Sequence, residues 1–469
     1  MAQKTQTSPA KGCRDFLPQE VRRRQYATRI IRQVFEKYGF EPLQTPTFER
    51  LETLLGKYGE EGDQLLFKVL LRGQPLLQGI RRASEYLSQP GAIVTGRSGE
   101  TAPGAEMLLA DVGLRYDQTV PLARVYAAYQ AKLPPVFKSF QIQPVWRADT
   151  PGKGRFREFY QCDVDVVGSS SLSAEVELGA VASECLTRLG FESFNIRINH
   201  RVLLRAIVQL ADVPETLEAE AITAIDKSDR LGIPGVEAEL EKRGVDKQAR
   251  MSLLSLVGER PSLERIKRHV AGHAPGRQAV EEVEAVLSLS EVTPAARRFA
   301  FDVSLARGLD YYTGCIFEAA APNLAVSLGG GGRYDNLIGM FMNRRAPACG
   351  FSLGLERILV AMEEGGLFPE SLDHLDLVVA ACRQQEQRAA IELAAKLRSA
   401  DRRVELTLNA MQPGKLRKYA DERRIPMAVW LEPGESERAS LWTRADGSIQ
   451  TGLSFDQIIL LLTRRAQAV

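Results

Sequence analysis

The residues with the clearest chemical potential lie between positions 145 and 168, which read VWRADTPGKGRFREFYQCDVDVVG. A turn with one proline and two glycines is surrounded there by four cations, Arg147, Lys153, Arg155 and Arg157. Guanidinium groups hold phosphate oxygens through paired hydrogen bonds, so this cluster suits a polyphosphate. From these residues alone, a solvated basic hairpin that pairs with its own acidic residues is an equally good interpretation.

The spacing within this stretch predicts an antiparallel hairpin, because two strand-like runs flank the turn. Side chains two positions apart on a strand share a face. Gln161, Asp163 and Asp165 are therefore expected to point the same way.

Asp117 and Thr119 form a second candidate site, in the segment LRYDQTVPLARVYAAY (114–129). The segment predicts a strand followed by a helix, with Pro121 near the helix start, where proline is tolerated. Polar side chains at that point can bind an ammonium group, or they can cap the helix, which is the commoner role.

Glycines mark a third region of interest. Four consecutive glycines (329–332) end an apolar run, where they permit a bulge or the close approach of a ligand. Residues 350–357 predict a strand that leads into a helix, with Arg357 in its first turns. Each signal is weak by itself, since an arginine at such a position is usually a surface residue.

Composition describes an ordinary globular protein. The chain has 469 residues, enough for roughly three domains, with 44% hydrophobic and 26% charged residues. Its 61 basic and 59 acidic residues leave a net charge of +2, which neither requires nor excludes a nucleic-acid partner.

Cysteine and histidine usage gives no metal-binding pattern. The six cysteines are dispersed without a CxxC pair, and the closest histidines, His269 and His273, have a spacing more typical of a helix face than of a zinc site. Free thiols indicate a reducing compartment. The N-terminus has no apolar signal segment, and no apolar run reaches about 18 residues. The expected location is the cytoplasm, without membrane attachment.

The order of elements predicts a mixed α/β (α+β) fold. A helix from Pro18 to about Tyr38 precedes a short strand, and a polar linker (363–374) leads to a small α/β domain with a mixed sheet. The expected division is 1–200 and 296–365 as two parts of one core, 201–295 as an inserted helical module and 375–469 as a C-terminal domain.

The C-terminal segment GKLRKYADERR carries the densest basic cluster of that part, made of Lys415, Arg417, Lys418, Arg423 and Arg424. Two acidic residues, Asp421 and Glu422, lie among these cations. A solvated helix face is therefore as good an interpretation as a nucleic-acid contact.

Taken together, these stretches resemble the class II aminoacyl-tRNA synthetases, and within them the histidyl-tRNA synthetase family. The first helix followed by PTFE (46–49) is similar to motif 1 of the class, the hairpin 147–161 to motif 2, and residues 350–357 to motif 3. The stretches LRYDQT, FYQCDVD, ARGLDYYTG and GGRYDNLIGMF resemble histidyl elements. Residues 71–113, with an expected loop or insertion at 89–104, are longer than in many relatives and have no assigned role.

The resemblance implies a class II catalytic core on an antiparallel sheet, a helical insertion and a C-terminal anticodon-binding domain. It implies a ligase that activates L-histidine with ATP to histidyl-adenylate and transfers it to the 3′ end of tRNA(His). Mg²⁺ would bridge the ATP phosphates, with its protein ligands unassigned, and the chain would form a homodimer. Lys415, Arg417 and Lys418 would contact tRNA phosphates.

Within the resemblance, motifs 2 and 3 supply the ATP site. Arg147 would hold the α-phosphate and neutralise charge as the histidine carboxylate attacks it, which makes it a catalytic residue. Arg155 would bind the terminal phosphates, and Asp149 is expected in the same site. Phe159 and Arg357 would sandwich the adenine by stacking and cation–π contact.

The histidine pocket is implied in the same way. Arg307 would be a second α-phosphate cation and catalytic residue, placed with Arg147 beside the substrate. Asp165 and Tyr312 would hydrogen-bond the two imidazole nitrogens. The α-ammonium group and the pocket wall account for the remaining expected contacts, Asp117, Gln118, Thr119, Gln161 and Tyr311.

Two other classes of protein share parts of this sequence pattern. A non-catalytic paralogue, the regulatory subunit of ATP phosphoribosyltransferase, resembles the synthetase core but typically lacks the C-terminal domain and loses phosphate-binding arginines. Here residues 375–469 are present, as are Arg147, Arg155, Arg307 and Arg357. A synthetase for threonine, proline or glycine is disfavoured by the RGLDYYTG and FYQCDVD elements.

Overall fold

The computed structural model divides the chain into two compact units, Met1–Leu367 and Phe368–Val469. The residues that it describes are 7–89, 104–152, 154–258, 260–306, 311–322, 327–369, 372, 375–435 and 437–466. The expected loop at 89–104 and the expected linker at 363–374 therefore lie partly outside the described residues. The finer domain boundaries stay a prediction.

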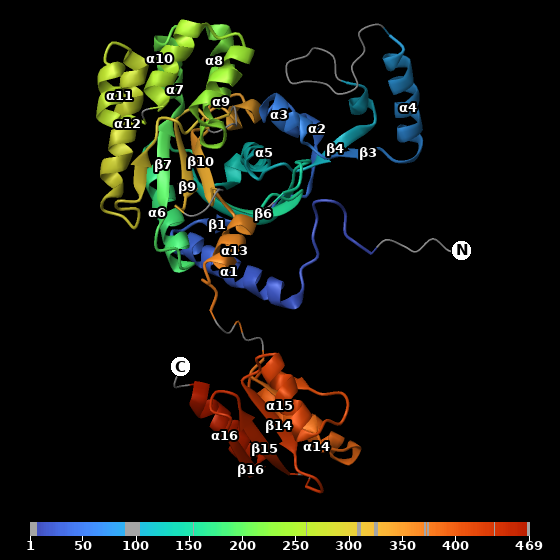
Figure 1. Ribbon diagram of the computed structural model, residues 1–469. Helices are drawn as coiled ribbons and strands as arrows, with labels where there is room; N and C mark the ends of the chain where they lie inside the picture. Colours follow the sequence, from blue (N-terminus) through green and yellow to red (C-terminus); the bar gives the residue numbers. More distant parts are fainter. Residues whose placement is uncertain are drawn as a thin grey trace. The chain divides into compact units, whose positions relative to one another are not determined.

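A mixed sheet forms the centre of the first unit (Figure 1). Among the described residues it has eight strands, in the spatial order β1 (Glu41–Pro42), β5 (Phe137–Trp146), β6 (Glu158–Val167), β11 (Ala348–Gly354), β10 (Gly329–Arg333), β9 (Cys315–Ala320), β7 (Asn195–His200) and β8 (Phe299–Phe301). Its inner pairs are antiparallel, and the edge pairs β1–β5 and β7–β8 are parallel. The antiparallel core that the sequence predicts is confirmed.

The predicted hairpin is the pair β5–β6, which stays in register from Phe137 opposite Val167 to Trp146 opposite Glu158. On its other side β6 pairs with β11, so that Asp165 lies opposite Gly350 and Gln161 lies opposite Gly354. The hairpin is thus an internal part of the sheet. This excludes the interpretation of strand β6 as part of a solvated basic hairpin.

Four glycines build strand β10, where the sequence left open a bulge or a close approach. The strand is regular, and its backbone approaches its neighbour closely: a Cβ on Gly331 would lie 1.9 Å from the carbonyl oxygen of Gly350. Glycine is required there because any side chain would overlap the adjacent strand.

Three helices pack against one another and against this sheet, namely α1 (Pro18–Lys37), α6 (Ser173–Arg188) and α13 (Leu355–Glu364). Helix α1 begins at a proline and ends before Gly39, whose φ of 74° lies in the left-handed region. It buries one apolar stripe, Ala27, Ile30, Ile31, Val34 and Phe35. The predicted first helix is therefore an amphipathic packing helix.

A helical module lies between β7 and β8 in the sequence and groups together in Figure 1. Its helices are α7 (Arg201–Leu210), α8 (Glu218–Ile225), α9 (Ser228–Lys242), α10 (Lys247–Gly258), α11 (Leu263–His269) and α12 (Ala274–Ser290). Helix α12 packs on α7 and α6 and so joins the module to the sheet layer.

Short elements complete the first unit. A small antiparallel sheet has the order β2 (Phe48–Arg50), β4 (Ala110–Leu114), β3 (Lys68–Leu70). The helices near it in sequence are α2 (Leu51–Leu54), α3 (Gly59–Gln64), α4 (Gly73–Leu87) and α5 (Thr119–Tyr129). Single 3-10 turns occur at η1 (Ala105–Leu108), η2 (Gln130–Lys132), η3 (Glu215–Leu217), η4 (Ile338–Phe341) and, in the second unit, η5 (Gln384–Glu386).

The second unit is a small α/β domain, as the sequence predicts. Its mixed sheet has the order β13 (Val404–Leu406), β12 (Leu377–Ala381), β14 (Met427–Leu431), β15 (Arg438–Thr443), β16 (Ile449–Ser454). Its helices are α14 (Gln387–Ser399), α15 (Pro413–Glu422) and α16 (Phe455–Ala466). Among the described residues of the whole chain, none of the helices has the length and apolar character needed to cross a membrane.

We expect Gly331→Ala to lower the free energy of unfolding by about 3 kcal/mol, because the new methyl group must push β10 away from β11. Gly272→Ala is a matched control, since a Cβ there meets nothing within 4 Å. Urea denaturation of the two variants measures the difference. Equal stability of the two would contradict the tight strand packing.

Candidate active site

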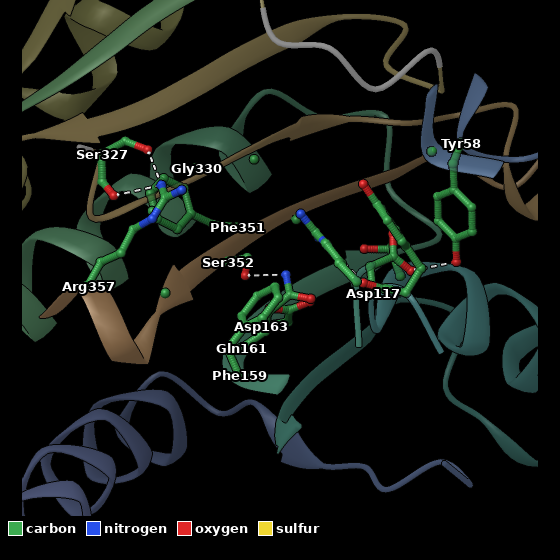
Figure 2. A pocket seen from close by; sticks show the side chains of 18 of the residues that line it. Tyr58, Asp117, Phe159, Gln161, Asp163, Ser327, Gly330, Phe351, Ser352 and Arg357 are labelled. Carbon is green, nitrogen blue, oxygen red and sulfur yellow. Dashed lines mark hydrogen bonds between the residues drawn. The ribbon is translucent and has the colours of Figure 1, made fainter. Parts of the chain in front are cut away.

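A cavity of about 450 Å³ opens on the sheet face formed by β6, β10 and β11. Strand β6 and the turn before it contribute Arg155, Phe159, Gln161, Asp163 and Asp165. Strand β10 contributes glycine backbone, which leaves room above the sheet. Figure 2 shows Asp117 and Tyr58 at one side of this cavity, and Arg357 and Ser327 at the other.

The end of the cavity near the hairpin turn is basic. The Arg147 guanidinium lies 4.2 Å from the ring centroid of Tyr116 and 5.2 Å from that of Phe159. Its Nε donates to the Tyr116 carbonyl oxygen at 3.1 Å. Two aromatic faces and one backbone acceptor therefore fix this cation in place without a carboxylate partner in those contacts.

Arg357 and Arg155 border the same end of the cavity. Arg357 lies in the first turn of α13, and its Nη1 donates to the carbonyl oxygen and to Oγ of Ser327 at 3.1 and 3.0 Å. Arg155 is less closely held, since its side chain is 56% exposed and its Nη1 lies 3.9 Å from Oδ1 of Asp149. An exposed pair at that distance is weak, so Arg155 can turn toward an anion.

Asp117 begins the acidic end of the cavity, where it is buried. Its Oδ1 accepts hydrogen bonds from the Val120 backbone N–H and the Tyr58 hydroxyl, both at 3.1 Å, and its Oδ2 accepts from Tyr311 at 3.4 Å. Burial raises the pKa of Asp117, while the Val120 N–H and nearby Arg147 lower it. Asp117 therefore both caps α5 and lines the cavity, so the two interpretations of this position are compatible.

Asp165 occupies the deepest part of the row on β6. It is 3% exposed, and its Oδ1 accepts from the Tyr334 hydroxyl at 2.6 Å. A Cβ on Gly350 of the neighbouring strand would lie 1.9 Å from that same oxygen, so the carboxylate needs a glycine opposite. Burial raises the pKa of Asp165 to about 7, although the Tyr334 hydrogen bond lowers it. The carboxyl group can thus change its protonation near neutral pH.

Gln161 and Asp163 lie on the same strand and the same face. Both are buried and line the cavity, as the period of two predicts. Burial and the neighbouring Asp165 raise the pKa of Asp163, whereas Ser352 and Arg147 lower it. Three carboxyl groups with raised pKa values, Asp117, Asp163 and Asp165, therefore share one cavity, which suits a ligand that carries cationic or N–H groups.

The structure brings together most of the residues singled out from the sequence. The cavity is lined by Asp117, Thr119, Arg147, Asp149, Arg155, Phe159, Gln161, Asp165, Tyr311, Tyr312 and Arg357. Gln118 differs: it is fully buried, and its Nε2 donates to the carbonyl oxygens of Gln143 and Gln161 at 2.9 Å, so it supports the strands outside the cavity lining. Arg307 lies outside the described residues.

The three cations expected to contact tRNA lie on α15. Lys415 and Lys418 are exposed, and Arg417 is partly buried. Lys418 lies 3.8 Å from Glu422 one turn later. An exposed pair of this kind adds little stability, so these cations remain open to an anionic partner.

Sequence reasoning missed three residues of the site. Tyr58 and Tyr334 donate to the buried carboxylates, and Ser352 accepts from Gln161 Nε2 at 2.9 Å. Tyr334 lies in the recognised GGRYDN stretch, which was a usable signal. Ser352 lies in the stretch 350–357 that resembles motif 3, but its partner Gln161 is 191 positions away. Tyr58 lies in no recognised motif, and its partner Asp117 is 59 positions away.

An antiparallel sheet with a cavity that is basic at one end and acidic at the other, followed by a separate α/β unit, is the arrangement of a class II aminoacyl-tRNA synthetase. The family model of histidyl-tRNA synthetase matches residues 12–77 and 109–358, and that of the anticodon-binding domain matches residues 376–464. The chain belongs to the histidyl-tRNA synthetase family.

Individual relatives agree over most of the chain. A histidine–tRNA ligase of Christiangramia forsetii is 39% identical over 93% of this chain and 94% of its own length. One of Porphyromonas gingivalis is 40% identical over 92% of each chain. The crystal structure of histidyl-tRNA synthetase from a Nostoc species covers 98% of this chain and 100% of that structure, with a TM-score of 0.76 at 27% identity.

A fourth comparison bears on the rival function. A Bacillus halodurans structure described as an ATP phosphoribosyltransferase regulatory subunit/histidyl-tRNA synthetase covers 89% of this chain and 97% of that structure. Its TM-score is 0.68 at 22% identity, which shows the shared fold alone.

We expect the stability of the first unit to fall as pH rises from about 4 to 7 because of Asp165. Its pKa of about 7 in the folded chain lies above the unfolded value of about 3.9, so the folded state binds the extra proton in that window. Asp165→Asn removes this dependence, and its melting temperature relative to the wild type should be more favourable at pH 8 than at pH 5 by several degrees. Differential scanning calorimetry of the full chain at pH 5 and pH 8 measures this gap, the difference in melting temperature between the variant and the wild type.

Asp111→Asn, at an exposed position, is the control and should leave the gap between the two pH values unchanged. A gap that is the same for Asp165→Asn at pH 5 and pH 8 would show that Asp165 is ionised throughout.

Proposed function

We propose that the cavity binds L-histidine at its acidic end and ATP at its basic end. The chain then activates histidine to histidyl-adenylate and transfers the histidyl group to the 3′ end of tRNA(His). The observation that carries this proposal is the charge division of one cavity, with Asp117, Asp163 and Asp165 at one end and Arg147, Arg155 and Arg357 at the other. Family membership supports the same reaction.

Activation joins the two substrates at the middle of the cavity. A carboxylate oxygen of histidine attacks the α-phosphorus of ATP, the new O–P bond forms, and the bond to the β-phosphate breaks to release pyrophosphate. Arg147 neutralises the charge that gathers on the α-phosphate oxygens, and Arg307 is proposed as the second cation. Positioning and electrostatics therefore supply most of the catalysis.

The nucleotide is proposed to lie between the hairpin and α13. Arg155 would hold the terminal phosphates, because its weak exposed pair with Asp149 can be exchanged for a phosphate contact. Phe159 and Arg357 would enclose the adenine, and both border the cavity. Transfer follows when a ribose hydroxyl of the tRNA attacks the acyl carbon and AMP leaves.

Histidine is proposed to bind along β6. Its ammonium group would meet Asp117, Thr119 and Gln161, and its imidazole would meet Asp165 and Tyr312. Asp165 suits this role because its Oδ2 has no hydrogen-bond partner among the described residues, while Tyr334 holds Oδ1. A carboxylate fixed in this way accepts from an imidazole N–H.

Mg²⁺ is proposed to enter with ATP, held by phosphate oxygens. The described residues contain no group of three or more histidine, cysteine or acidic side chains arranged to hold a metal ion. Glu356, an acidic residue of the cavity, is already paired with both Nη atoms of Arg24 at 3.0 Å.

The second unit is proposed to bind the anticodon region of tRNA through Lys415, Arg417 and Lys418 on α15, which its match to the anticodon-binding domain supports. We also propose that the chain acts in the cytoplasm as a homodimer, from the resemblance of α1 and PTFE (46–49) to motif 1. The rival regulatory subunit is disfavoured, because Arg147, Arg155 and Arg357 line the cavity and the second unit is present.

We expect ATP–pyrophosphate exchange to require histidine among the twenty amino acids. Arg147→Ala should slow it about 100- to 1000-fold, the usual effect of removing one group that stabilises transition-state charge. Arg268→Ala, on the exposed face of α11, is the matched control and should leave the exchange rate unchanged. Exchange with another amino acid would contradict the pocket assignment, and histidine binding without exchange would favour the regulatory subunit.

We expect the double variant Lys415→Glu/Lys418→Glu to weaken tRNA(His) binding about 10-fold or more and to flatten its salt dependence, because two phosphate contacts are lost. Filter binding at several salt concentrations measures both effects. Lys396→Glu on α14, another exposed lysine one turn from a glutamate, is the control. Histidine-dependent exchange should stay unchanged, and unaltered tRNA binding would refute the role of α15.

A further inference from the structure

Three acceptor atoms on β6 lack a hydrogen-bond partner within the described part of the chain. One is Oδ2 of Asp165, and the other two are Oε1 of Gln161 and Oδ1 of Asp163, although Gln161 and Asp163 are only 9% and 3% exposed. Buried acceptors without a partner cost free energy, so such atoms need an explanation. Both residues line the cavity, which makes a ligand the natural partner of these atoms. The proposed function assigns a contact to Gln161 and none to Asp163.

Ser352 connects these two side chains. It lies on β11 directly opposite Asp163, and Gln161 Nε2 donates to its Oγ at 2.9 Å (Figure 2). The Ser352 side chain is in turn hydrogen-bonded to Asp163. A serine hydroxyl has a single proton, and Gln161 supplies the proton of its own bond, so the Ser352 proton is available to Asp163 when that carboxyl is ionised.

We propose that Asp163 and Ser352 are positioning residues, which hold the Gln161 amide with its carbonyl oxygen toward the cavity. A carboxylate only accepts, a hydroxyl donates once, and an amide has one accepting and one donating end. The series from Gln161 to Ser352 to Asp163 therefore runs in one direction. This inference rests on the proposed function, since it requires the substrate's α-ammonium group to bind at Gln161.

The direction of the series decides which ligands fit. With Oε1 toward the cavity, Gln161 offers an acceptor to an ammonium group. With the amide rotated by half a turn, its NH₂ would face the ammonium, so that two donors would oppose each other. Without Ser352 the NH₂ group loses its partner on β11, and both orientations become available. We call the hydrogen-bonded series from Gln161 through Ser352 to Asp163 the relay. The relay thus selects a substrate with an amino group over one without it.

The accepting state of Asp163 depends on the ligand. Burial, Asp165 and Asp117 raise its pKa well above the usual value, although Ser352 and Arg147 lower it, so the empty cavity favours the protonated carboxyl. A bound ammonium group adds a positive charge beside the carboxyl group and favours its ionised form. Substrate binding and the direction of the relay therefore reinforce each other.

The test compares two ligands that differ by one amino group, histidinol and its deamino analogue 3-(imidazol-4-yl)propan-1-ol. Isothermal titration calorimetry on the full chain gives both dissociation constants. We expect the wild type to bind histidinol more tightly. Ser352→Ala should weaken histidinol about 10-fold and leave the deamino analogue within about twofold, because only the ammonium contact depends on the amide orientation. Ser352→Thr, which keeps the hydroxyl, should restore most of the preference.

Ser183→Ala on α6 is the matched control, since it removes another buried hydroxyl outside the cavity lining and should change neither constant. Asp163→Asn is a second probe of nearly equal size. Its amide can donate to Ser352 and reverse the relay, so the preference for histidinol should fall there too.

Equal weakening of both ligands by Ser352→Ala would indicate a merely structural serine and overturn the inference, as would an unchanged preference in both variants. A wild type that binds neither ligand would instead overturn the proposed function, and the inference with it.

Discussion

Burial of carboxylates on one face of the central sheet is the constraint that the rest of the site accommodates. Asp117, Asp163 and Asp165 are each 3% exposed or less, and burial raises the pKa of each. Each keeps at least one hydroxyl donor, from a tyrosine or from Ser352. The pKa values of Tyr58 and the other donor tyrosines are raised as well, so these hydroxyls stay protonated and able to donate. These hydrogen bonds from neutral hydroxyl groups offset part of the cost of burying the three acids.

One hairpin sets the geometry between the two ends of the cavity. Strand β6 carries Phe159 near the turn and Asp165 six positions later, on the same face. Strand β6 pairs with an antiparallel strand on each side, so the rise per residue of the strand sets the separation of these two side chains. No loop lies between them. The distance between the basic end and the acidic end of the cavity is therefore set by one strand.

Local patterns predicted the parts of the site that local rules determine. The alternation in FYQCDVD placed Gln161, Asp163 and Asp165 on one face, and the strand–helix boundary placed Asp117 at the start of α5. Contacts between distant segments lay beyond such rules: Ser352 meets Gln161 across 191 positions. The glycine run was ambiguous for the same reason, since its regular pairing depends on β9 and β11. The inward turn of Gln118 to backbone carbonyls likewise needs two strands that its own segment does not contain.

The glycine strand β10 has a consequence for how such a pocket can diversify. Its part of the cavity wall is backbone, and side chains are excluded where a Cβ at Gly329 or Gly331 would lie within 2.5 Å of a neighbouring carbonyl oxygen. Substitution of Gly329 or Gly331 is therefore not available as a way to reshape that wall for another substrate. Change is channelled to β6, to the segment before α5 and to the tyrosines around them. The backbone wall formed by β10 therefore stays constant, while the side chains of the other walls can change.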